Sequence, residues 1–320
     1  MNAALAQSRT TDSPSAIVNE RPIGARVLGG ADAEPGEYPS MVALVRQDAR
    51  PLEQRLFCGG TIVADRWILT AAHCVLDVFN RPLSTGRIRV VAGINDLALE
   101  TPDTEHSVIQ IVIHPGYDDT LVLPPNDIAL LELETPVAAP SVTLFTGETN
   151  DYTDSFGIIA GWGATGITDT NTFILPTVLQ DAAVPLITNA LCNAPESYNG
   201  LIVDRHLCAG FADGQVDTCA GDSGGPLFIQ ADGVRVQAGI TSLGTGCGQP
   251  FFYGIYTNVS HFIPWLSSYI EVPYQSPELI ASRQARKNRG LFGGVGGITM
   301  LLLLFAVYFR AWHPTRTKQG

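Results

Sequence analysis

Short apolar runs dominate the chain from residue 41 onward, and glycine, proline, asparagine or aspartate interrupts them every ten to twenty residues. Runs of this length, bounded by turn-forming residues, predict β-strands rather than helices. A polar stretch at 146–154 separates two sets of six runs. The first set comprises residues 41–45, 61–63, 67–70, 88–92, 108–113 and 128–133, and the second comprises 156–160, 177–183, 206–209, 226–229, 234–241 and 254–257.

The two sets predict an all-β body with two halves of similar size, at about 27–145 and 146–258. Together they are too long for a single sandwich of about 100 residues, so two barrels are the more natural arrangement. Apolar residues at helical spacing appear only after these strands, and they predict a helix at about 260–271 with Ser260 as its cap. The residues with this spacing are Phe262, Trp265, Leu266, Tyr269 and Ile270.

The beginning of the chain differs from this body. Residues 1–26 are polar and lack apolar periodicity, so we expect a propeptide or the remnant of a leader. Residues 4–6 (ALA) look like the end of a leader cleavage site, but no basic region or apolar core precedes them. A missing upstream start and an ordinary N-terminal segment are both compatible with this pattern.

The end of the chain holds its longest apolar run. Residues 291–309 contain no charged side chain, and as a helix they would span about 28 Å, close to the ~30 Å hydrocarbon core of a bilayer. A basic linker at 273–290 precedes this run, and a basic tail at 310–320 follows it. These flanks favour a transmembrane or sorting segment over a buried helix of a soluble domain.

Charge is distributed as unevenly as hydropathy. The whole chain has 19 basic and 31 acidic side chains, a net charge of −12, and this excess of acid argues against a nucleic-acid partner. Residues 273–320 hold seven of the basic side chains and one of the acidic ones, so they carry +6 while residues 1–272 carry −18. The tail is therefore basic, whereas the body that precedes it is acidic.

Cysteine usage indicates the compartment. The six cysteines form neither a C-x-x-C pair nor a zinc-like spacing with histidine, so disulfides are a better prediction than a metal site. Their spacing does not choose among the pairings that six cysteines allow. Disulfides favour an oxidising environment, and hence export.

Three short motifs carry candidate chemistry. The first is GDSGGP at 221–226, where flanking glycines leave the Ser223 hydroxyl and the neighbouring amides accessible. His73 closes an apolar run in AAHC at 71–74, and Asp127 opens another in NDIALL at 126–131. Taken singly, each residue has a structural explanation, as a turn, a core histidine or a cap.

Taken together, in the chain order His73, Asp127 and Ser223, these motifs resemble the trypsin/chymotrypsin-like serine protease family. The resemblance covers about residues 27–271 and implies a protease domain at 27–272. The implied fold is all-β, with two antiparallel six-stranded Greek-key β-barrels and a C-terminal helix, followed here by a separate hydrophobic tail helix.

The resemblance also implies catalytic roles, with no cofactor and no metal. His73 would take the proton of the Ser223 hydroxyl and later protonate the leaving amine, while Asp127 orients the imidazole. The amides of Gly221 and Ser223 would form the oxyanion hole, and Ser242 matches the serine that supports the aspartate. Because His73 must be neutral to act, kcat/KM is expected to rise through a pKa near the usual ~6.5 of imidazole.

Substrate choice follows from the same resemblance. Asp217 matches the floor of the primary specificity pocket, and Gly244 and Gly254 match its walls, which implies protein or peptide substrates cleaved after Arg or Lys. Leu243 departs from the family pattern, which usually has tryptophan there. Ile94 stands where calcium-binding members have glutamate, so we expect no calcium at that loop.

The segment RVLGG at 26–30 resembles the activation junction of the family. Cleavage after Arg26, by another protease or by the enzyme itself, would free the α-ammonium of Val27 to pair with Asp222 and order the oxyanion amides. The family pairing would give the disulfides Cys58–Cys74, Cys192–Cys208 and Cys219–Cys247.

The tail has a resemblance of its own. GGVGG at 293–297, followed by an apolar run and a basic end, resembles the bacterial GlyGly-CTERM sorting signal, which implies a sorting protease as partner. A permanent membrane anchor through 291–309 is the alternative.

The combined expectation is an exported serine endopeptidase, extracellular or at the cell surface and made as a zymogen. The alternatives are a catalytically silent protease-like binding module held at the membrane and a tethered adhesion protein. Retention of all three motif residues argues against both.

Overall fold

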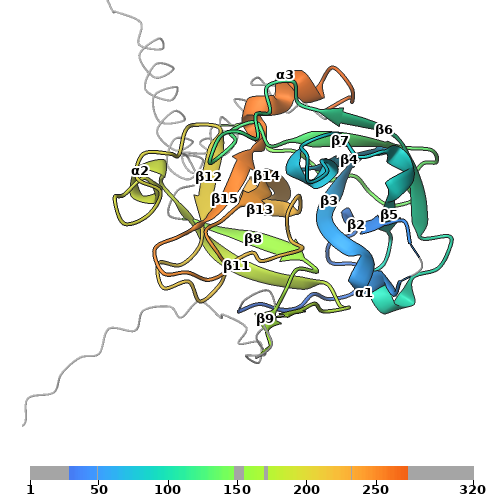
Figure 1. The fold of residues 1–320 in the computed structure, drawn as a ribbon, viewed down its shortest axis with the longest axis horizontal. Helices are drawn as coiled ribbons and strands as arrows, with labels where there is room; N and C mark the ends of the chain where they lie inside the picture. Colours follow the sequence, from blue (N-terminus) through green and yellow to red (C-terminus); the bar gives the residue numbers. More distant parts are fainter. Residues whose placement is uncertain (1–28, 49, 148–154, 169–171, 232, 273–320) are drawn as a thin grey trace, which may run out of the picture. The chain divides into compact units, whose positions relative to one another are not determined.

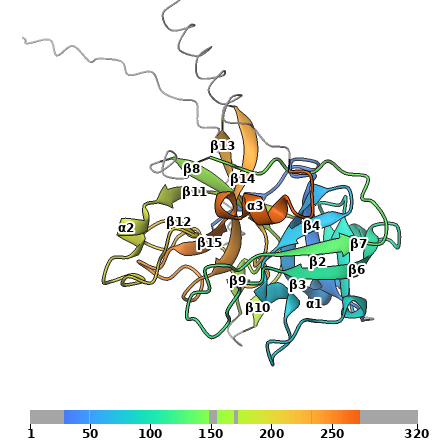
Figure 2. The same ribbon diagram turned by 90° about the horizontal axis from the view of Figure 1, so that it is seen from above.

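The computed structural model describes residues 29–272, except 49, 148–154, 169–171 and 232. These residues form two β-barrels that lie side by side in both views (Figure 1, Figure 2). The chain divides into a unit that ends at Glu271 and a unit that begins at Val272, one residue before the predicted boundary. The predicted leader, linker and tail segments lie outside the described residues. Within the described residues, no helix is both long enough and apolar enough to cross a membrane.

The first barrel closes through six antiparallel strands in the order β2-β3-β4-β7-β6-β5. Aliphatic side chains such as Val42, Leu44, Ile62, Ile68 and Leu130 are completely buried. Burial of this apolar surface drives closure, and closure leaves no unpaired sheet edge. The strands are β2 (Met41–Arg46), β3 (Leu56–Ala64), β4 (Trp67–Thr70), β5 (Ile88–Ala92), β6 (Glu105–Ile113) and β7 (Ala129–Leu133).

The second barrel closes in the order β8-β11-β12-β15-β14-β13, because β13 also pairs with β8. When the strands of each barrel are numbered along the chain, both barrels have the order 1-2-3-6-5-4. Ile159, Leu227, Val236 and Tyr256 belong to the buried core of the second barrel. Its strands are β8 (Phe156–Gly161), β11 (Gln180–Ile187), β12 (His206–Ala209), β13 (Pro226–Ala231), β14 (Val234–Leu243) and β15 (Gly254–Asn258).

The predicted all-β fold with two six-stranded antiparallel barrels is confirmed, but several strands differ from the predicted runs, β3 and β11 most of all. β3 extends well beyond residues 61–63 and includes two glycines, which weaken strands by propensity. Close packing requires one of them, because a Cβ at Gly60 would lie 2.9 Å from the Leu69 carbonyl oxygen. β11 begins three residues later than predicted, because the amide of Leu97 and the carbonyl of Asn95 bond to residues 177 and 179.

The beginning of the described chain belongs to the second barrel. β1 (Ala31–Asp32) pairs with β11, although these residues fall in the predicted first half. The turn before β1 is tightly packed, since a Cβ at Gly29 would lie 2.5 Å from the Gln215 carbonyl oxygen. The N-terminal segment is therefore fixed against the loop that precedes Asp217.

Helices are short throughout the described residues. The predicted helix at 260–271 starts as the 3-10 helix η5 (Val259–Phe262), continues as α3 (Ile263–Leu266) and ends in a turn. It is shorter than predicted: the Ser267 amide and hydroxyl both donate to the Ile263 carbonyl, and no α-helical residue follows Leu266 in the described part of the chain. The remaining elements are β9 (Gly166–Ile167), β10 (Phe173–Ile174), α1 (Leu52–Arg55), α2 (Asn189–Cys192), η1 (His73–Val75), η2 (Thr85–Arg87) and η3 (Leu97–Leu99).

Candidate active site

The first barrel supplies a histidine and an aspartate that contact each other directly. His73 starts η1 directly after β4, and Asp127 lies two residues before β7. The Nδ1 atom of His73 lies 2.7 Å from Asp127 Oδ2, and the His73 amide donates to Oδ1 at 2.9 Å. Ser242 in β14 donates its hydroxyl to Oδ2 at 2.5 Å. The carboxylate is thus held from both barrels.

Burial and charge act in opposite directions on this pair. Burial would raise the pKa of Asp127, which is 1% exposed, but the charge of His73 and the hydrogen bonds of His73 and Ser242 outweigh it and lower that pKa. Burial would lower the pKa of His73, but the charge and hydrogen bond of Asp127 raise it above the usual 6.5. The pair therefore favours an ionised aspartate beside an imidazole that readily accepts a proton.

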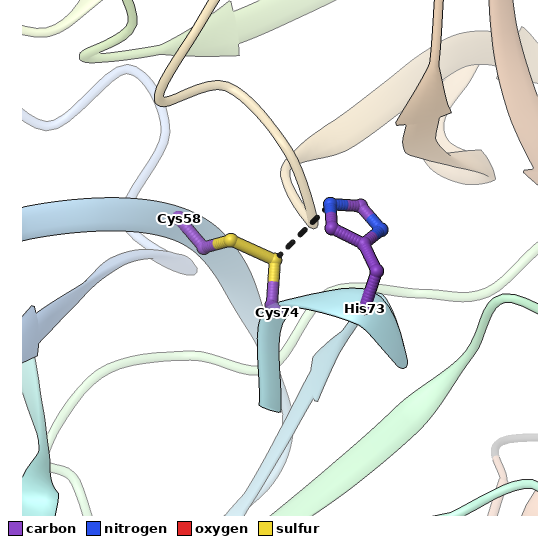
Figure 3. Close-up of side chains that lie close together, drawn as sticks. All are labelled: Cys58, His73 and Cys74. Atoms are coloured by element: carbon purple, nitrogen blue, oxygen red, sulfur yellow. Dashed lines mark hydrogen bonds between the residues drawn. A yellow bond between two sulfur atoms is a disulfide. The ribbon is translucent and has the colours of Figure 1, made fainter. Parts of the chain in front are cut away.

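The Cys58–Cys74 disulfide fixes the histidine turn to β3 (Figure 3). The other ring nitrogen of His73, Nε2, faces this disulfide at 3.7 Å from Cys74 Sγ. Potential ligand atoms of Cys58, His73 and Cys74 lie within 4.8 Å of one another. The two sulfurs are bonded to each other, so they are not the thiolates that a zinc site needs.

Ser223 lies in the tight turn that leads into β13, and this turn contacts the first barrel. The Gly59 amide donates to the Ser223 carbonyl at 2.8 Å. Gly224 has φ +79, and a Cβ there would lie 2.2 Å from Thr70 Oγ1 and 3.2 Å from the Ala71 amide nitrogen. The glycine thus allows the serine turn to approach the segment that leads to His73. Among the described residues, Ser223 Oγ forms no hydrogen bond with His73, a separation common in unliganded active sites.

Two backbone amides at Ser223 are hydrogen-bonded and two are not. The amide of Asp222 donates to the Cys219 carbonyl and that of Gly224 to the Thr241 carbonyl. The amides of Gly221 and Ser223 have no acceptor among the described residues. Gly221 has φ +103, a conformation that other residues rarely adopt. Two unpaired donors on one turn can receive an anionic oxygen.

Asp217 is a buried carboxylate that pairs with no cationic side chain among the described residues. It is 6% exposed, and its Oδ2 accepts the Gly248 amide at 2.9 Å. A Cβ at Gly254 would lie 3.2 Å from Oδ1, whereas one at Gly244 would meet only the Gly246 carbonyl, at 3.5 Å. Burial raises the pKa of Asp217 to about 6. A side chain at position 254 would crowd the carboxylate, and glycine leaves that contact free.

Asp222 is the second carboxylate of this kind. It is 2% exposed and accepts the amides of Gly163 at 2.8 Å and Cys219 at 3.0 Å. A Cβ at Gly163 or Gly161 would collide with the carboxylate, so both glycines make room for it. Burial raises the pKa of Asp222 to about 6, and no cationic side chain pairs with it among the described residues.

The arrangement has the parts of a nucleophilic hydrolase, and comparison with known proteins decides the family. A model of the trypsin family matches residues 27–266. The chain belongs to the trypsin family. It is 38% identical over 251 residues to coagulation factor IX of Cavia porcellus, which covers 75% of this chain and 80% of that protein. It is 34% identical over 250 residues to transmembrane protease serine 5 of Homo sapiens, which covers 77% of this chain but only 52% of that protein.

Family membership makes the chain a trypsin-like serine endopeptidase, a hydrolase of protein substrates. The structure brings His73, Asp127 and Ser242 into direct contact and places Ser223 against the same segment. It also pairs Cys58 with Cys74, Cys192 with Cys208 and Cys219 with Cys247, as the resemblance implies. Arg26 and Val27 lie outside the described residues.

Two polar contacts near the site escaped the sequence analysis. Thr257 in β15 donates its hydroxyl to the Asp127 carbonyl at 2.8 Å, and no motif distinguishes it from any other strand threonine. Arg55 lies between Glu100, in the loop that contains Ile94, and Glu105, at the start of β6, with bonds of 2.5 Å and 2.7 Å. Two carboxylates therefore share one buried guanidinium beside the loop where the sequence predicts no calcium.

Proposed function

We propose that this chain is an exported endopeptidase that cleaves after Arg and Lys through an acyl-enzyme, and that it is made as a zymogen activated by cleavage after Arg26. The observation that carries the specificity is the Asp217 carboxylate, which is buried, pairs with no cationic side chain among the described residues and adjoins Gly254 rather than a larger side chain. A guanidinium or ammonium of the substrate would supply the missing charge.

Family membership and the contacts of His73 support the following reaction. The imidazole takes the Ser223 proton at Nε2 while Asp127 and Ser242 hold its other face, so the serine oxygen can attack the scissile carbonyl. The unpaired amides of Gly221 and Ser223 receive the negative oxygen. His73 then donates its proton to the leaving amine, and water hydrolyses the acyl-enzyme by the same path.

The second cation-free carboxylate supports activation by cleavage. Gly29 contacts the loop that leads to Asp222, and Val27 lies two residues upstream, within about 7 Å of chain. Cleavage after Arg26 would create an ammonium at Val27, which we infer folds back toward Asp222. Its pairing with Asp222 would order the Gly221 and Ser223 amides. The cut needs a protease that recognises Arg, which includes the mature enzyme itself.

Three disulfides support export, because such bonds persist in oxidising compartments. We assign residues 291–309 to a membrane or sorting segment that tethers or releases the catalytic unit. Mass spectrometry of the mature chain tests this assignment. A new C-terminus near residues 293–297 supports removal by a sorting protease, an intact Gly320 in a membrane fraction supports an anchor, and an intact chain that stays soluble contradicts both.

A fluorophosphonate probe tests the proposed nucleophile. The probe should label the chain after cleavage at Arg26 and should not label a Ser223→Ala variant. The matched control is Ser260→Ala, a serine distant from the motif, which should be labelled like the wild type. Failure of the cleaved wild type to react would overturn the proposed activity.

A panel of peptides that differ only at the residue before the scissile bond tests specificity. Arg and Lys peptides should be cleaved at least about 100-fold faster than Phe or Leu peptides, since a desolvated ion pair is worth several kcal/mol. Faster cleavage of Phe or Leu peptides would refute the assignment of Asp217.

A further inference from the structure

A second buried histidine lies behind the catalytic aspartate. His206 in β12 is 1% exposed, and its cross-strand partner is Thr257 of β15. Thr257 in turn donates its hydroxyl to the Asp127 carbonyl at 2.8 Å. His206 is thus one strand away from the group that holds the Asp127 main chain.

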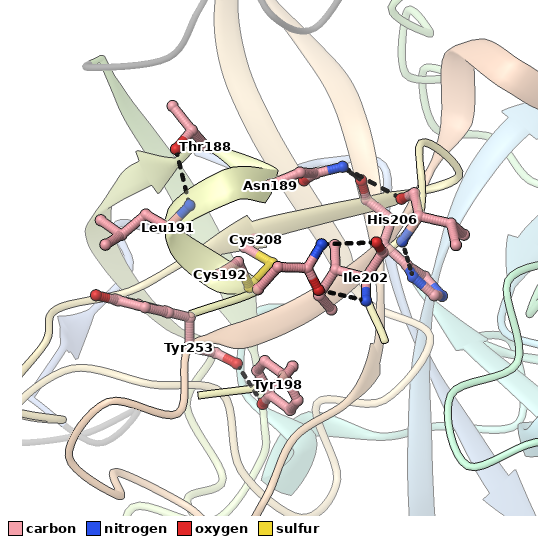
Figure 4. Close-up of a disulfide and its surroundings, with 11 residues drawn as sticks. Thr188, Asn189, Leu191, Cys192, Tyr198, Ile202, His206, Cys208 and Tyr253 are labelled. Carbon is pink, nitrogen blue, oxygen red and sulfur yellow. Dashed lines mark hydrogen bonds between the residues drawn. A yellow bond between two sulfur atoms is a disulfide. The ribbon is translucent and has the colours of Figure 1, made fainter. Parts of the chain in front are cut away.

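The ring of His206 has polar neighbours on two sides. The Val203 amide donates to Nδ1 at 3.3 Å, which closes the turn that leads into β12 (Figure 4). Because Nδ1 accepts this bond, the proton of the neutral ring is on Nε2. The backbone of Pro124 lies near enough to the ring to favour its protonated form, so its carbonyl is the acceptor available to the Nε2 proton.

Pro124 connects this ring to the active site. It is buried in the first-barrel segment that delivers Asp127, three residues before the aspartate. Its neighbour Leu123 packs against the cluster formed by the Cys192–Cys208 disulfide, Ile202 and Tyr253. The second barrel therefore holds the segment at 123–127 through an apolar contact and through His206.

We propose that His206 is a positioning residue: its neutral ring ties Pro124 to β12 and so keeps Asp127 directed at His73. Protonation would place an N–H on Nδ1 opposite the Val203 N–H, two donors face to face, and would loosen the tie. The inference rests on the proposed catalysis, and it adds an acid-sensitive support to the triad.

The charges around His206 favour its neutral form at physiological pH. Burial lowers the pKa of His206 below its usual 6.5, and this effect outweighs the Pro124 hydrogen bond and the negative charge of Asp127, which would raise it. Asp204 and Arg205 lie in its own turn, and Arg205 also acts on His114 at the end of β6. Thr257 and Asn189, from β15 and α2, carry no charge. The pKa values of the two histidines therefore differ: that of His73 is raised above 6.5 and that of His206 is lowered below it.

Two substitutions separate the two contacts of the ring. In His206→Gln, the amide nitrogen replaces Nε2 and can still donate to Pro124. In His206→Asn, the side-chain oxygen replaces Nδ1 and can still accept from Val203, but the bond to Pro124 is lost. The exposed His261 provides the control His261→Gln. Each variant is measured as the full chain cleaved after Arg26.

If His206 acts by positioning Asp127, the variants should lose kcat in a specific order. His206→Asn should lose about tenfold in kcat at pH 8, the effect of one lost hydrogen bond, with KM within about twofold. His206→Gln should retain kcat within about threefold. At pH values below the pKa of His206, a plot of log kcat/KM against pH should approach a slope of two in the wild type and in His261→Gln. In His206→Gln the slope should stay at one. If His206→Gln lost more kcat than His206→Asn, or if the slopes of the pH profiles were identical, the role of His206 would be confined to the turn at Val203.

An NMR measurement distinguishes failure of this inference from failure of the proposed function. In a full-length Ser223→Ala chain, which needs no activity, the 15N shifts of His206 should report an Nε2–H tautomer that titrates below 6.5. An Nδ1–H tautomer, or a ring already charged at neutral pH, would overturn the inference. Absence of fluorophosphonate labelling in the cleaved wild type would instead overturn the proposed function and leave the NMR result to decide the structural contact.

Discussion

Three carboxylates in this molecule are almost equally buried, yet they are ionised to different extents. Asp127 is 1% exposed, Asp222 2% and Asp217 6%. The pKa of Asp127 is lowered, whereas burial raises the pKa of each of the other two to about 6. The difference lies in their partners, because Asp127 has a histidine and a serine hydroxyl, whereas the others accept backbone amides.

The comparison shows which site is complete in the described chain. The Asp127 site contains its own partners, an imidazole that can take a proton and a serine hydroxyl, so it is already preorganised. Asp217 and Asp222 pair with no cationic side chain among the described residues, and each unpaired carboxylate costs stability at neutral pH. We infer that the substrate completes Asp217 and that the new N-terminus completes Asp222. Four predictions test this division.

The largest effect is expected at the complete site. Asp127→Asn should reduce kcat about 10⁴-fold, the loss typical of this replacement in serine proteases, because the amide stabilises the wrong tautomer of His73. Steady-state kinetics with an Arg peptide measures it. Asp118→Asn, an exposed acid of the same segment, is the control and should stay within about threefold. A loss below about tenfold would remove Asp127 from the mechanism.

The next effect concerns the carboxylate assigned to the N-terminus. Asp222→Asn, cleaved after Arg26 by an added Arg-specific protease, should lose about 10³-fold in kcat/KM, because the oxyanion amides are no longer ordered. Arg26→Gln, which cannot be cleaved there, should show a similarly low activity as the full-length chain. Wild-type activity in either variant would refute activation through Val27 and Asp222.

Loss of the pocket carboxylate should act on selectivity more than on chemistry. Asp217→Asn should reduce kcat/KM for Arg peptides about 100-fold and leave Leu peptides within about threefold, since only a cationic side chain uses the lost charge. Asp213→Asn, an exposed acid earlier in the same loop, is the matched control. An equal loss for Arg and Leu peptides would indicate damage to the fold rather than to the pocket.

The smallest effect follows from the pKa of Asp217 in the free enzyme, about 6. A small amidinium inhibitor binds the ionised carboxylate, so its affinity should decrease as the pH falls through 6 and be about tenfold weaker at pH 5 than at pH 8. Calorimetry at both pH values measures this, together with proton release on binding at pH 6. The Asp217→Asn variant should show no such pH dependence, and a flat wild-type profile would contradict the prediction.

The sequence predicted features that depend on short motifs or local periodicity. Two sets of apolar runs predicted the two barrels, because a strand buries the same face wherever it pairs. GDSGGP and its partner motifs located the triad, and the cysteine positions agreed with a family pairing. The structure then placed His73, Asp127 and Ser242 in contact as those motifs implied.

What the sequence did not reveal depends on contacts between distant segments. Arg55 meets Glu100 and Glu105 across 45 and 50 residues, and no pattern marks an arginine with that role. His206 looks like an ordinary strand residue until β12 is placed against the segment before Asp127. The length of the C-terminal helix was overestimated because apolar spacing indicates which face of a segment is buried but not where the helix ends.

The shared 1-2-3-6-5-4 strand order has a consequence for the biogenesis of the enzyme. Each barrel closes through strands of its own half of the chain. His73 and Asp127 come from the first half, whereas Ser223, Asp217 and Ser242 come from the second. A chain made from its N-terminus can complete its earlier half while the segment that holds Ser223 is still unmade. Hydrolytic capacity cannot arise until β15 has been made and the later half has closed, so the strand order itself delays activity until the catalytic unit is complete.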